Sequence, residues 1–223
     1  MSARRELALE QLLPNFEISE LPRPIDLRTI TGQANVIVDF GSGMGSHSLA
    51  LAQTNPTIGV LAIDVHTVGL LAVAEEATAL GLTNLRTHHG DGMDVFKDWL
   101  TPQSIDEIHI LFPDPWPKAR HHKRRLVSSA FLGIAFESLK PGGRMIFATD
   151  DESYFASAFE IFSQFEKLDV SLNDWEVPMT SYHQRALRLG HKVSQLSASK
   201  NYFLGNTPSI ACRMSFQLEA NPG

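Results

Sequence analysis

Short apolar runs alternate with stretches of three-to-four spacing from Asn35 onward. An apolar period of two, or a short continuous apolar run, predicts a buried strand, whereas a period of 3.6 predicts an amphipathic helix. The repeated order of strand, turn and helix predicts an α/β fold with one doubly wound, Rossmann-like, mostly parallel sheet and helices on both faces. The predicted strands are Val36–Phe40, Ile58–Ile63, Leu85–His88, Ile105–Phe112, Arg144–Thr149 and Phe165–Ser171, and the predicted helices are Ser46–Gln53, Thr67–Leu80, Arg124–Leu139 and Glu152–Phe162.

The two ends of the chain carry weaker patterns. Residues 1–32 contain a short leucine-rich amphipathic stretch followed by prolines at positions 14, 22 and 24, which predicts an N-terminal helix and a linker. Residues 33–223 then form the predicted domain. Near the C-terminus, Ile210–Leu218 alternates between apolar and polar residues and predicts a strand, and Val193–Ser199 is a weaker candidate for one.

Composition narrows the class of protein. A length of 223 residues with 43% hydrophobic and 20% charged residues suits a single domain. No apolar run approaches a membrane span and Met1–Glu6 lacks the core of a signal peptide, so we expect a cytoplasmic protein that does not bind membranes. Cys212 is the sole cysteine, and His121 and His122 have no partner at metal-ligand spacing, so neither a disulfide framework nor a metal site is predicted.

Charge is distributed unevenly along the chain. The formal net charge is −6, yet residues 115–136 and 177–218 hold five basic residues each and no acid. The remainder has nine basic residues against 25 acids, or 9 − 25 = −16. Because local field steers a charged partner more than total charge does, we expect the two basic windows to converge and to dock a polyanion.

A glycine-rich turn, Gly41-Ser42-Gly43-Met44-Gly45, follows the first predicted strand of the domain. Glycines permit a tight turn and close approach of a ligand, and such turns serve both dinucleotides and S-adenosylmethionine. Here Ser46 stands where a dinucleotide fingerprint has its third glycine. In addition, Asp39 would repel a pyrophosphate but can pair with the ammonium group of S-adenosylmethionine. We therefore expect S-adenosylmethionine as the cofactor, bound by Asp39, Gly41, Gly43 and Gly45.

Two more acids stand at predicted strand ends. Asp64 ends the second strand, where a carboxylate can accept from both hydroxyls of a ribose, and Asp91 follows the third, where it could accept from the amine of adenine. Taken singly, each fits an ordinary helix cap or turn residue equally well. Together with Asp39 they occupy three successive strand ends, which line one crevice in a doubly wound sheet. The set predicts a cofactor crevice.

The most distinctive stretch is Phe112-Pro113-Asp114-Pro115-Trp116-Pro117-Lys118, which continues into a basic run. Its three prolines fix a rigid, extended turn that presents Asp114 and Trp116 beside cations. A carboxylate, an indole and a basic run suit a nucleic-acid base, although Trp116 could equally anchor the turn. The side chains interpreted as phosphate contacts are Lys118, Arg120, Lys123, Arg124 and Arg125, and some of them could instead support the following helix.

These residues resemble the bacterial tRNA (guanine-N7)-methyltransferases of the TrmB type. The glycine turn, Asp64-Val65-His66 and above all the proline-rich turn with its basic run carry the resemblance, which covers about residues 35–191. Ala148-Thr149-Asp150, Thr180-Ser181-Tyr182 and Arg188-Leu189-Gly190-His191 are similar to later motifs of that family. The resemblance implies a seven-stranded class I S-adenosylmethionine-dependent fold that methylates N7 of guanine 46 in the variable loop of tRNA.

The resemblance also implies residue roles. Asp39, Asp64 and Asp91 would contact the cofactor, Asp114 would be the active-site carboxylate, and Lys118, Asp150 and the segment Thr180-Ser181-Tyr182-His183 would meet the tRNA. The chemistry is consistent with these roles, because guanine N7 carries a lone pair and no proton, so it needs alignment rather than a general base. Asp114 can accept from guanine N1–H and the N2 amine, a pair of donors that adenine lacks.

Two departures from the family leave alternatives open. His183 replaces the family's usual glutamate and Arg185-Ala186 replaces its Arg-Gly, and a histidine cannot accept from amines as a carboxylate does. A non-catalytic tRNA-binding homologue is therefore one alternative. An amino methyltransferase acting on another RNA or DNA base is a second, and a nicotinamide dehydrogenase is a more distant third. The sequence leaves monomer and homodimer undecided.

Overall fold

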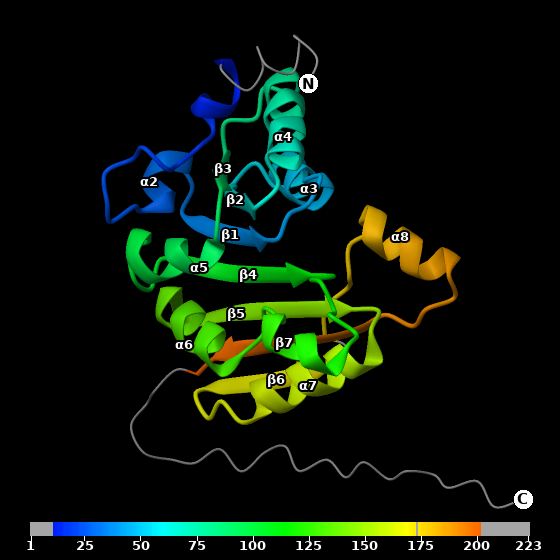
Figure 1. Ribbon diagram of the computed structural model, residues 1–223. Coiled ribbons are helices and arrows are strands. Elements are labelled where there is room, and N and C mark those ends of the chain that lie inside the picture. The colour runs from blue at the N-terminus through cyan, green and yellow to red at the C-terminus, as the bar shows by residue number, and fades with distance from the viewer. Residues whose placement is uncertain (1–10, 173, 202–223) are drawn as a thin grey trace, which may run out of the picture.

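The sheet is the frame of the molecule. A computed structural model describes residues 11–172 and 174–201, and its seven strands lie in the order β3-β2-β1-β4-β5-β7-β6 (Figure 1). Strands β1 to β5 pair in parallel, whereas β7 runs antiparallel to both β5 and β6. The predicted fold class is confirmed. The strands are β1 Asn35–Phe40, β2 Ile58–Asp64, β3 Leu85–His89, β4 Ile105–Leu111, β5 Leu139–Thr149, β6 Leu168–Leu172 and β7 Ser194–Lys200.

Helices cover both faces of the sheet. They are α2 Leu27–Thr31, α3 Ser46–Thr54, α4 Thr67–Ala79, α5 Gly92–Asp94, α6 Ser129–Ser138, α7 Glu152–Ser163 and α8 Ser181–Arg188, with single helical turns at Leu13–Asn15, Val95–Trp99 and Ala119–Arg124. Figure 1 shows α8 standing beside the body at the end where β4 points. Within the described ranges, no helix combines the length and apolarity needed to cross a bilayer.

Alternation along the strands divides the core in two. Val60 and Ala62 of β2 pack into the cluster formed with α3 and α4, whereas Leu61 and Ile63 pack into the larger cluster on the other face. Successive side chains of a strand point to opposite faces, so a strand buried on both sides must be apolar throughout. This explains the continuous apolar runs Val36–Val38 in β1 and Val60–Ile63 in β2.

The helix predicted over Arg124–Leu139 is wrong at both ends. The basic run forms the single turn Ala119–Arg124, and α6 begins only at Ser129, where the Ser128 hydroxyl accepts from the backbone N–H of Phe131 at 3.2 Å. At the other end, Leu139 already belongs to β5. That strand continues through Pro141-Gly142-Gly143 as an irregularity in the pairing with β4, because Gly142 adopts a positive φ of 77°.

The C-terminal part of the sheet also differs from the prediction. The predicted strand Phe165–Ser171 starts later, at Leu168, because Phe165 completes a turn onto Phe162 after α7. The weaker candidate, Val193–Ser199, is present as β7 between β5 and β6. The predicted strand Ile210–Leu218 lies outside the described residues.

The segment before β1 packs against the sheet. Glu17 pairs in parallel with Thr87 at the outer edge of β3, and Ile18, Ile25 and Leu27 are buried in the larger core cluster. Residues 11–32 therefore share a core with the residues that follow. The predicted boundary at residue 33 stays a prediction, and most of the predicted N-terminal helix lies outside the described residues.

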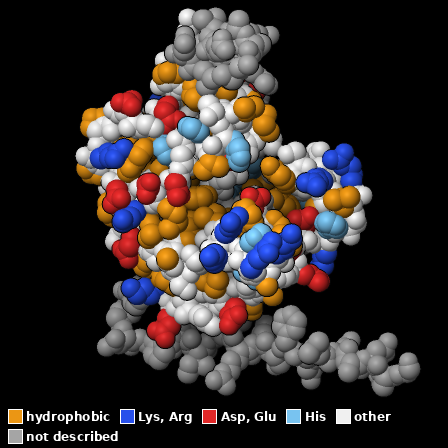
Figure 2. Space-filling model, in the orientation of Figure 1, with side chains coloured by type: hydrophobic (Ala, Val, Ile, Leu, Met, Phe, Trp, Pro, Cys, Tyr) orange, Lys and Arg blue, Asp and Glu red, His pale blue; other side chains and the backbone are white. Residues whose placement is uncertain are grey.

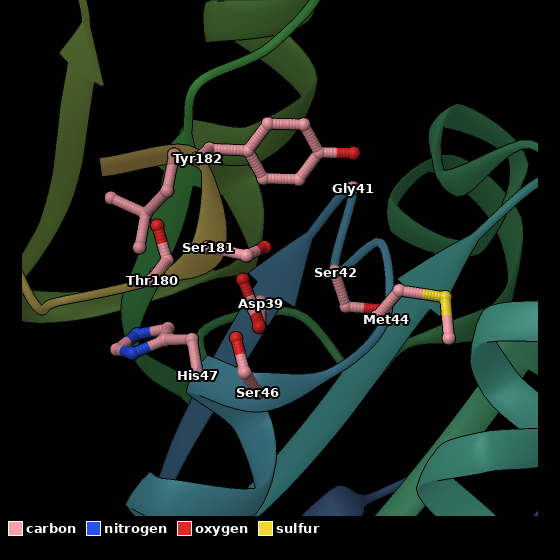
Figure 3. Close-up of a pocket in the computed structure, with 10 residues that line it drawn as sticks. Asp39, Gly41, Ser42, Met44, Ser46, His47, Thr180, Ser181 and Tyr182 are labelled. Carbon is pink, nitrogen blue, oxygen red and sulfur yellow. The ribbon is translucent and has the colours of Figure 1, made fainter. Parts of the chain in front are cut away.

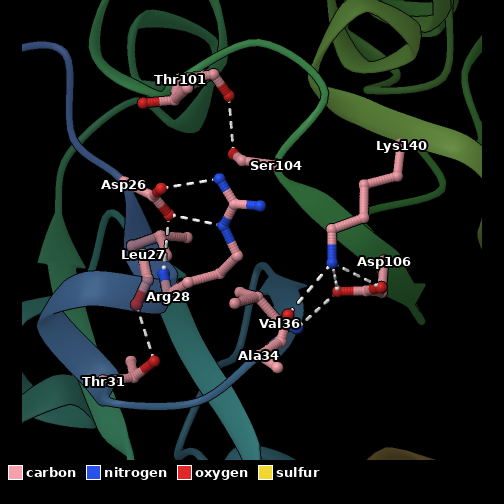
Figure 4. Close-up of polar contacts among 10 residues, drawn as sticks. All are labelled: Asp26, Leu27, Arg28, Thr31, Ala34, Val36, Thr101, Ser104, Asp106 and Lys140. Carbon is pink, nitrogen blue, oxygen red and sulfur yellow. Dashed lines mark hydrogen bonds and ion pairs between the residues drawn. The ribbon is translucent and has the colours of Figure 1, made fainter.

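Polar contacts link residues at the end of the sheet where β1 and β4 begin (Figure 4), and Asp106 and Lys140 also line an open cavity there. Asp106 accepts from Lys140 Nζ at 2.8 Å and from the backbone N–H of Val36 at 2.7 Å. Asp26 caps α2 by accepting from the backbone N–H of Arg28 at 3.0 Å. In a doubly wound sheet, a ligand site is nevertheless expected at the opposite end, at the carboxyl ends of the parallel strands.

Candidate active site

A pocket lies at the carboxyl end of β1, beside the ends of β2 and β4 (Figure 3). Asp39 forms its floor with only 2% of its surface exposed, and its Oδ2 accepts from Ser48 Oγ at 2.5 Å. The described residues that line it include one acid and neither lysine nor arginine. They are Asp39, Gly41, Ser42, Met44, Ser46, His47, Leu111, Thr180, Ser181 and Tyr182.

The glycine turn is required by its surroundings. Gly41, Gly43 and Gly45 all have positive φ, from 57° to 77°. A Cβ on Gly45 would lie 1.9 Å from Val73 Cγ2 of α4, which no real contact allows. A Cβ on Gly43 would lie 3.3 Å from the Tyr182 ring, so the turn and the first residues of α8 already touch.

The three predicted strand-end acids take different places. Asp64 is buried and braces the glycine turn, because its Oδ2 accepts from Gly43 N–H and its Oδ1 from His66 N–H, both at 2.8 Å. Asp91 caps α5 by accepting from Met93 N–H at 2.9 Å and is exposed. Since β3, β2 and β1 are neighbouring strands, the structure places the three acids along one edge of the sheet, with Asp39 alone in the wall of the pocket.

A chain of buried side chains lies behind the pocket. His47 Nε2 hydrogen-bonds His109 Nδ1 at 2.8 Å, and His109 Nε2 in turn hydrogen-bonds Glu107 at 2.8 Å. Burial lowers the pKa of His47, against an opposing effect of Asp39, so the imidazole next to the pocket is neutral at pH 7. Glu107 also pairs with Arg144 at 2.9 Å. This chain could not be predicted from the sequence, because no local pattern pairs histidines 62 positions apart.

The turn that carries Asp114 follows β4, the strand next to β1. Leu111, three residues before Asp114, lies in the pocket wall, and Asp114 itself is exposed. Phe112 and Trp116, on either side of it, have φ values of 52° and 45°. A non-glycine residue in this region costs about 1–3 kcal/mol, so the turn is strained on both sides of its carboxylate.

Side chains of the basic run divide into two groups. Lys118, Arg120, Lys123 and Arg124 are exposed, and Arg124 lies over the Trp116 ring at 5.0 Å, which ties that indole to the run. The phosphate-contact role predicted for Arg125 is wrong for the structure as it stands. Arg125 is only 8% exposed, since its Nε donates to the carbonyl of Pro115 at 2.8 Å and its guanidinium faces α7.

The predicted substrate residues of α8 reach the pocket that Asp39 lines. Thr180 caps α8 by accepting from His183 N–H at 3.1 Å, and Thr180, Ser181 and Tyr182 line the wall opposite the glycine turn. His183 turns inward, because its Nδ1 lies 3.1 Å from the Pro178 carbonyl and its ring lies 5.8 Å from that of Phe112. The sequence analysis missed α8, although Thr180 is a typical N-cap residue.

Asp150 stands just before α7. Its neighbour Asp151 is the helix cap, accepting from Tyr154 N–H at 2.7 Å, so Asp150 is left to pair with His191 Nδ1 at 2.8 Å. This hydrogen bond ties the segment after α8 to the start of α7.

In the second basic window, α8 lies beside the end of β4, whereas Lys200 is buried and donates to the carbonyls of Phe136 and Leu139. The ring contact between Phe112 and His183 joins the end of β4 to α8. Figure 2 shows two groups of Lys and Arg side chains on one face, one near its centre and one over α8 at its edge. Arg185 and Arg188 of α8 are exposed, so the second group presents its charge to solvent.

Known proteins resemble this chain over most of its length. A family profile described as "Putative methyltransferase" matches residues 33–196. A tRNA (guanine-N(7)-)-methyltransferase from Nitrosomonas eutropha is 40% identical over 199 residues, which cover 86% of this chain and 89% of that protein. A tRNA (guanine-N(7)-)-methyltransferase from Nitrosomonas europaea is 37% identical, over 85% of this chain and 87% of that protein. The chain belongs to the tRNA (guanine-N7)-methyltransferase family. The family resemblance and the methyltransferase activity predicted from the sequence are confirmed.

Solved methyltransferase structures share the fold. An rRNA methylase from Streptococcus thermophilus aligns with a TM-score of 0.53 at 16% identity, covering 82% of this chain and all of that one (100%). The aminoglycoside resistance methyltransferase NpmB1 aligns with a TM-score of 0.56 at 19% identity. The alignment covers 77% of this chain and 89% of that one. As a member of a methyltransferase family, this tRNA (guanine-N7)-methyltransferase uses S-adenosylmethionine. The pocket fits that cofactor, since an acid without a basic neighbour in the wall suits a cation and not a pyrophosphate.

Proposed function

We propose that this methyltransferase acts on guanine 46 in the variable loop of tRNA, with the guanine held between the Asp114 turn and the Asp39 pocket. The observation that supports this most directly is that the strand leading to Asp114 also lines the pocket, through Leu111. A base gripped by Asp114 therefore lies at the mouth of the cofactor site. Since its substrate is tRNA, we also place the enzyme in the cytoplasm.

We assign cofactor binding to the glycine turn and the acids around it. Asp39 has one oxygen bonded to Ser48 and a second available to accept from the ammonium group. Asp64 holds the turn in place and can accept from the ribose, and Asp91 can accept from the adenine amine in addition to its capping bond. Bound S-adenosylmethionine supplies a methyl group on a positively charged sulfur.

Asp114 orients the guanine and stabilises charge. Its carboxylate is exposed at the tip of a proline-stiffened turn, where it can accept from N1–H and the N2 amine of one guanine edge. That grip directs N7, which has no proton to lose, toward the methyl group. The negative charge also favours the positive charge that the base gains on methylation, an interaction stronger in the transition state than before it.

The tRNA backbone meets two exposed basic groups. Lys118, Arg120, Lys123 and Arg124 lie on one side of the site, with Arg185 and Arg188 of α8 on the other. Such contacts position a nucleic acid without reading its sequence. We assign Asp150 and the Thr180–Tyr182 segment to the nucleotides around the target. His183, packed against Phe112, supports the turn and does not stand in for the family's carboxylate as an acceptor.

Nucleoside analysis tests this function. The purified protein is incubated with S-adenosylmethionine and tRNA from cells lacking 7-methylguanosine, and the tRNA is digested and examined by mass spectrometry. We expect 7-methylguanosine in the fragment that contains the variable loop. A methylated exocyclic amine would support the amino methyltransferase instead, and tRNA binding without any methylated product would support the non-catalytic homologue.

A further inference from the structure

Arg125 is the most heavily bonded cation of the proline-rich region. Its Nε donates to the Pro115 carbonyl at 2.8 Å, its Nη1 to Ser157 Oγ at 2.9 Å and to the Ser153 carbonyl at 3.3 Å, and its Nη2 to Ser153 Oγ at 3.1 Å. The guanidinium also lies over the Tyr154 ring at 4.8 Å, and Asp151 is 4.0 Å away. Every nitrogen of the guanidinium is therefore used inside the protein.

These bonds join two parts of the site. Pro115 is the residue after Asp114, whereas Ser153 and Ser157 lie in the first turns of α7, just after Asp150. A single side chain thus holds the turn of the proposed guanine-binding acid against the helix start that carries a proposed tRNA-binding acid. Tyr154 strengthens the joint, because its hydroxyl accepts from the backbone N–H of Val127 at 3.1 Å.

The turn needs such a restraint. Phe112 and Trp116 hold left-handed backbone conformations on either side of Asp114, and strain of this kind persists only where surrounding contacts impose it. On the Phe112 side, the backbone N–H bonds to the Ala148 carbonyl of β5 at 2.8 Å. On the Trp116 side, the bond from Arg125 to Pro115 supplies the corresponding restraint. Without it, the second half of the turn is free to relax and to carry Asp114 with it.

We propose that Arg125 is a positioning residue for Asp114: it fixes the strained turn against α7 so that the carboxylate meets the guanine edge in the productive orientation. This inference rests on the proposed function of Asp114. It also separates Arg125 from its neighbour Arg124, which is exposed and free to contact phosphate. Two adjacent arginines of one basic run, Arg124 and Arg125, therefore have different roles.

The geometry calls for arginine. The guanidinium is planar and donates in several fixed directions at once, toward the turn with Nε and toward α7 with the two terminal nitrogens. A lysine keeps the charge and much of the stem, yet its single ammonium group cannot reach the Pro115 carbonyl and both serines together. Arg125→Lys is therefore a conservative change that breaks the joint and preserves the charge.

Single-turnover kinetics with saturating tRNA and cofactor test the proposal. We expect Arg125→Lys to lower the rate of methyl transfer about ten- to hundredfold, since misplacement of a catalytic group by about 1 Å costs that much. The affinities for tRNA and for S-adenosylhomocysteine should stay within about twofold of the parent enzyme, because the charge and the cofactor pocket are unchanged. If Arg125 served only to bind phosphate, lysine would fulfil that role as well, and Arg125→Lys would keep a rate close to that of the parent enzyme.

Arg86→Lys is the matched control. Arg86 also donates from a partly buried guanidinium to backbone carbonyls, those of Leu85 at 2.7 Å and Thr83 at 3.0 Å, but it does so at β3, away from the Asp114 turn. Both variants should lose some thermal stability, and Arg86→Lys should keep the parent rate. Should Arg125→Lys fail to fold, Ser153→Ala combined with Ser157→Ala removes the side-chain acceptors on α7 and should give a smaller fall in the same rate.

A double-mutant cycle with Asp114→Asn isolates the positioning role. If Arg125 acts through Asp114, Arg125→Lys should change the residual rate of the Asp114→Asn enzyme by less than about threefold. Full multiplication of the two effects would overturn the inference, as would a parent-like rate for Arg125→Lys in an enzyme that forms 7-methylguanosine. An enzyme that forms no 7-methylguanosine at all would overturn the proposed function and this inference with it.

Discussion

At the scale of single residues, the charge of the pocket selects the cofactor. Asp39 is nearly fully buried, and no lysine or arginine stands among the described residues that line the pocket with it. A cation on the ligand would balance a buried carboxylate of this kind, and we propose that the amino group of S-adenosylmethionine is that cation.

Removing this charge should affect one end of the ligand only. We expect Asp39→Asn to weaken the binding of S-adenosylhomocysteine at least tenfold, since a hydrogen bond to a charged group contributes about 1.5–3 kcal/mol. The binding of 5′-methylthioadenosine, which lacks the amino acid part, should not change. Calorimetry with both ligands measures the difference, with the exposed acid Asp94→Asn as the control. Equal weakening of both ligands would show that the substitution only disturbs the fold.

The sequence predicts some site residues and is silent about others. The sequence predicts Asp39 from the glycine turn, Asp114 from the proline-rich turn and Asp64 from its place at a strand end, and the structure places Asp39 in the pocket wall. The bond between His47 and His109, and the bonds from Arg125 to Ser153 and Ser157, connect positions 62, 28 and 32 residues apart. Contacts of this kind arise from topology, so no local pattern announces them.

At the scale of elements, α8 controls access to the cofactor pocket. The cavity measures only about 20 Å³, because Tyr182 leans over Gly43 and the first turn of α8 forms one wall. Cofactor sites usually measure about 300–1,000 Å³, so we propose that this turn moves as the cofactor enters.

Shortening Tyr182 should therefore speed cofactor entry. We expect Tyr182→Ala to raise the association rate of S-adenosylhomocysteine several-fold in stopped-flow measurements of tryptophan fluorescence. Tyr182→Phe, which keeps the ring over Gly43, should behave like the parent. Identical association rates for the alanine and phenylalanine variants would mean that α8 does not limit entry.

Elements with strong periodicity could be predicted, and those set by tertiary contacts could not. The strands from β1 to β4 and the helices α3, α4 and α7 lie within a residue or two of their predicted positions. The start of α6 was predicted five residues early, because the basic run continues the helical spacing while Arg125 is held by Pro115 and α7. The helix α8 is amphipathic but spans only eight residues and buries only Ala186, so it has too few apolar positions for a helical period to stand out in the sequence.

At the scale of the whole molecule, the N-terminal segment is tied to the edge of the sheet through Glu17. Its Oε1 lies 3.0 Å from His88 Nδ1 and accepts from Ser19 Oγ at 2.6 Å, and its Oε2 accepts from His89 N–H at 2.9 Å. Burial alone would raise the pKa of Glu17, but hydrogen bonds and the charge of His88 outweigh it and lower the pKa below the ordinary 4.5.

The Glu17 carboxylate should make the free energy of unfolding depend on pH in the acidic range. A carboxyl group whose pKa is lower in the folded than in the unfolded state stabilises the fold above its ordinary pKa, and that contribution is lost as pH falls below 4.5. We expect Glu17→Gln to lower the free energy of unfolding at pH 7 by about 1–2 kcal/mol, and the gap to the parent to narrow below pH 4.5. Urea denaturation of both proteins at pH 7 and below pH 4.5 measures this difference in the free energy of unfolding. A gap that stays constant with pH would assign the effect to packing.

We propose that Asp114 holds the guanine while a separate pocket holds the cofactor. The most direct test is the single-turnover rate of 7-methylguanosine formation by Asp114→Asn, measured together with its affinity for S-adenosylhomocysteine. We predict a rate at least about a hundredfold below that of the parent, because a charge that stabilises the transition state is lost, with cofactor affinity unchanged. A rate within a few-fold of the parent, or a matching loss of cofactor affinity, would contradict the account.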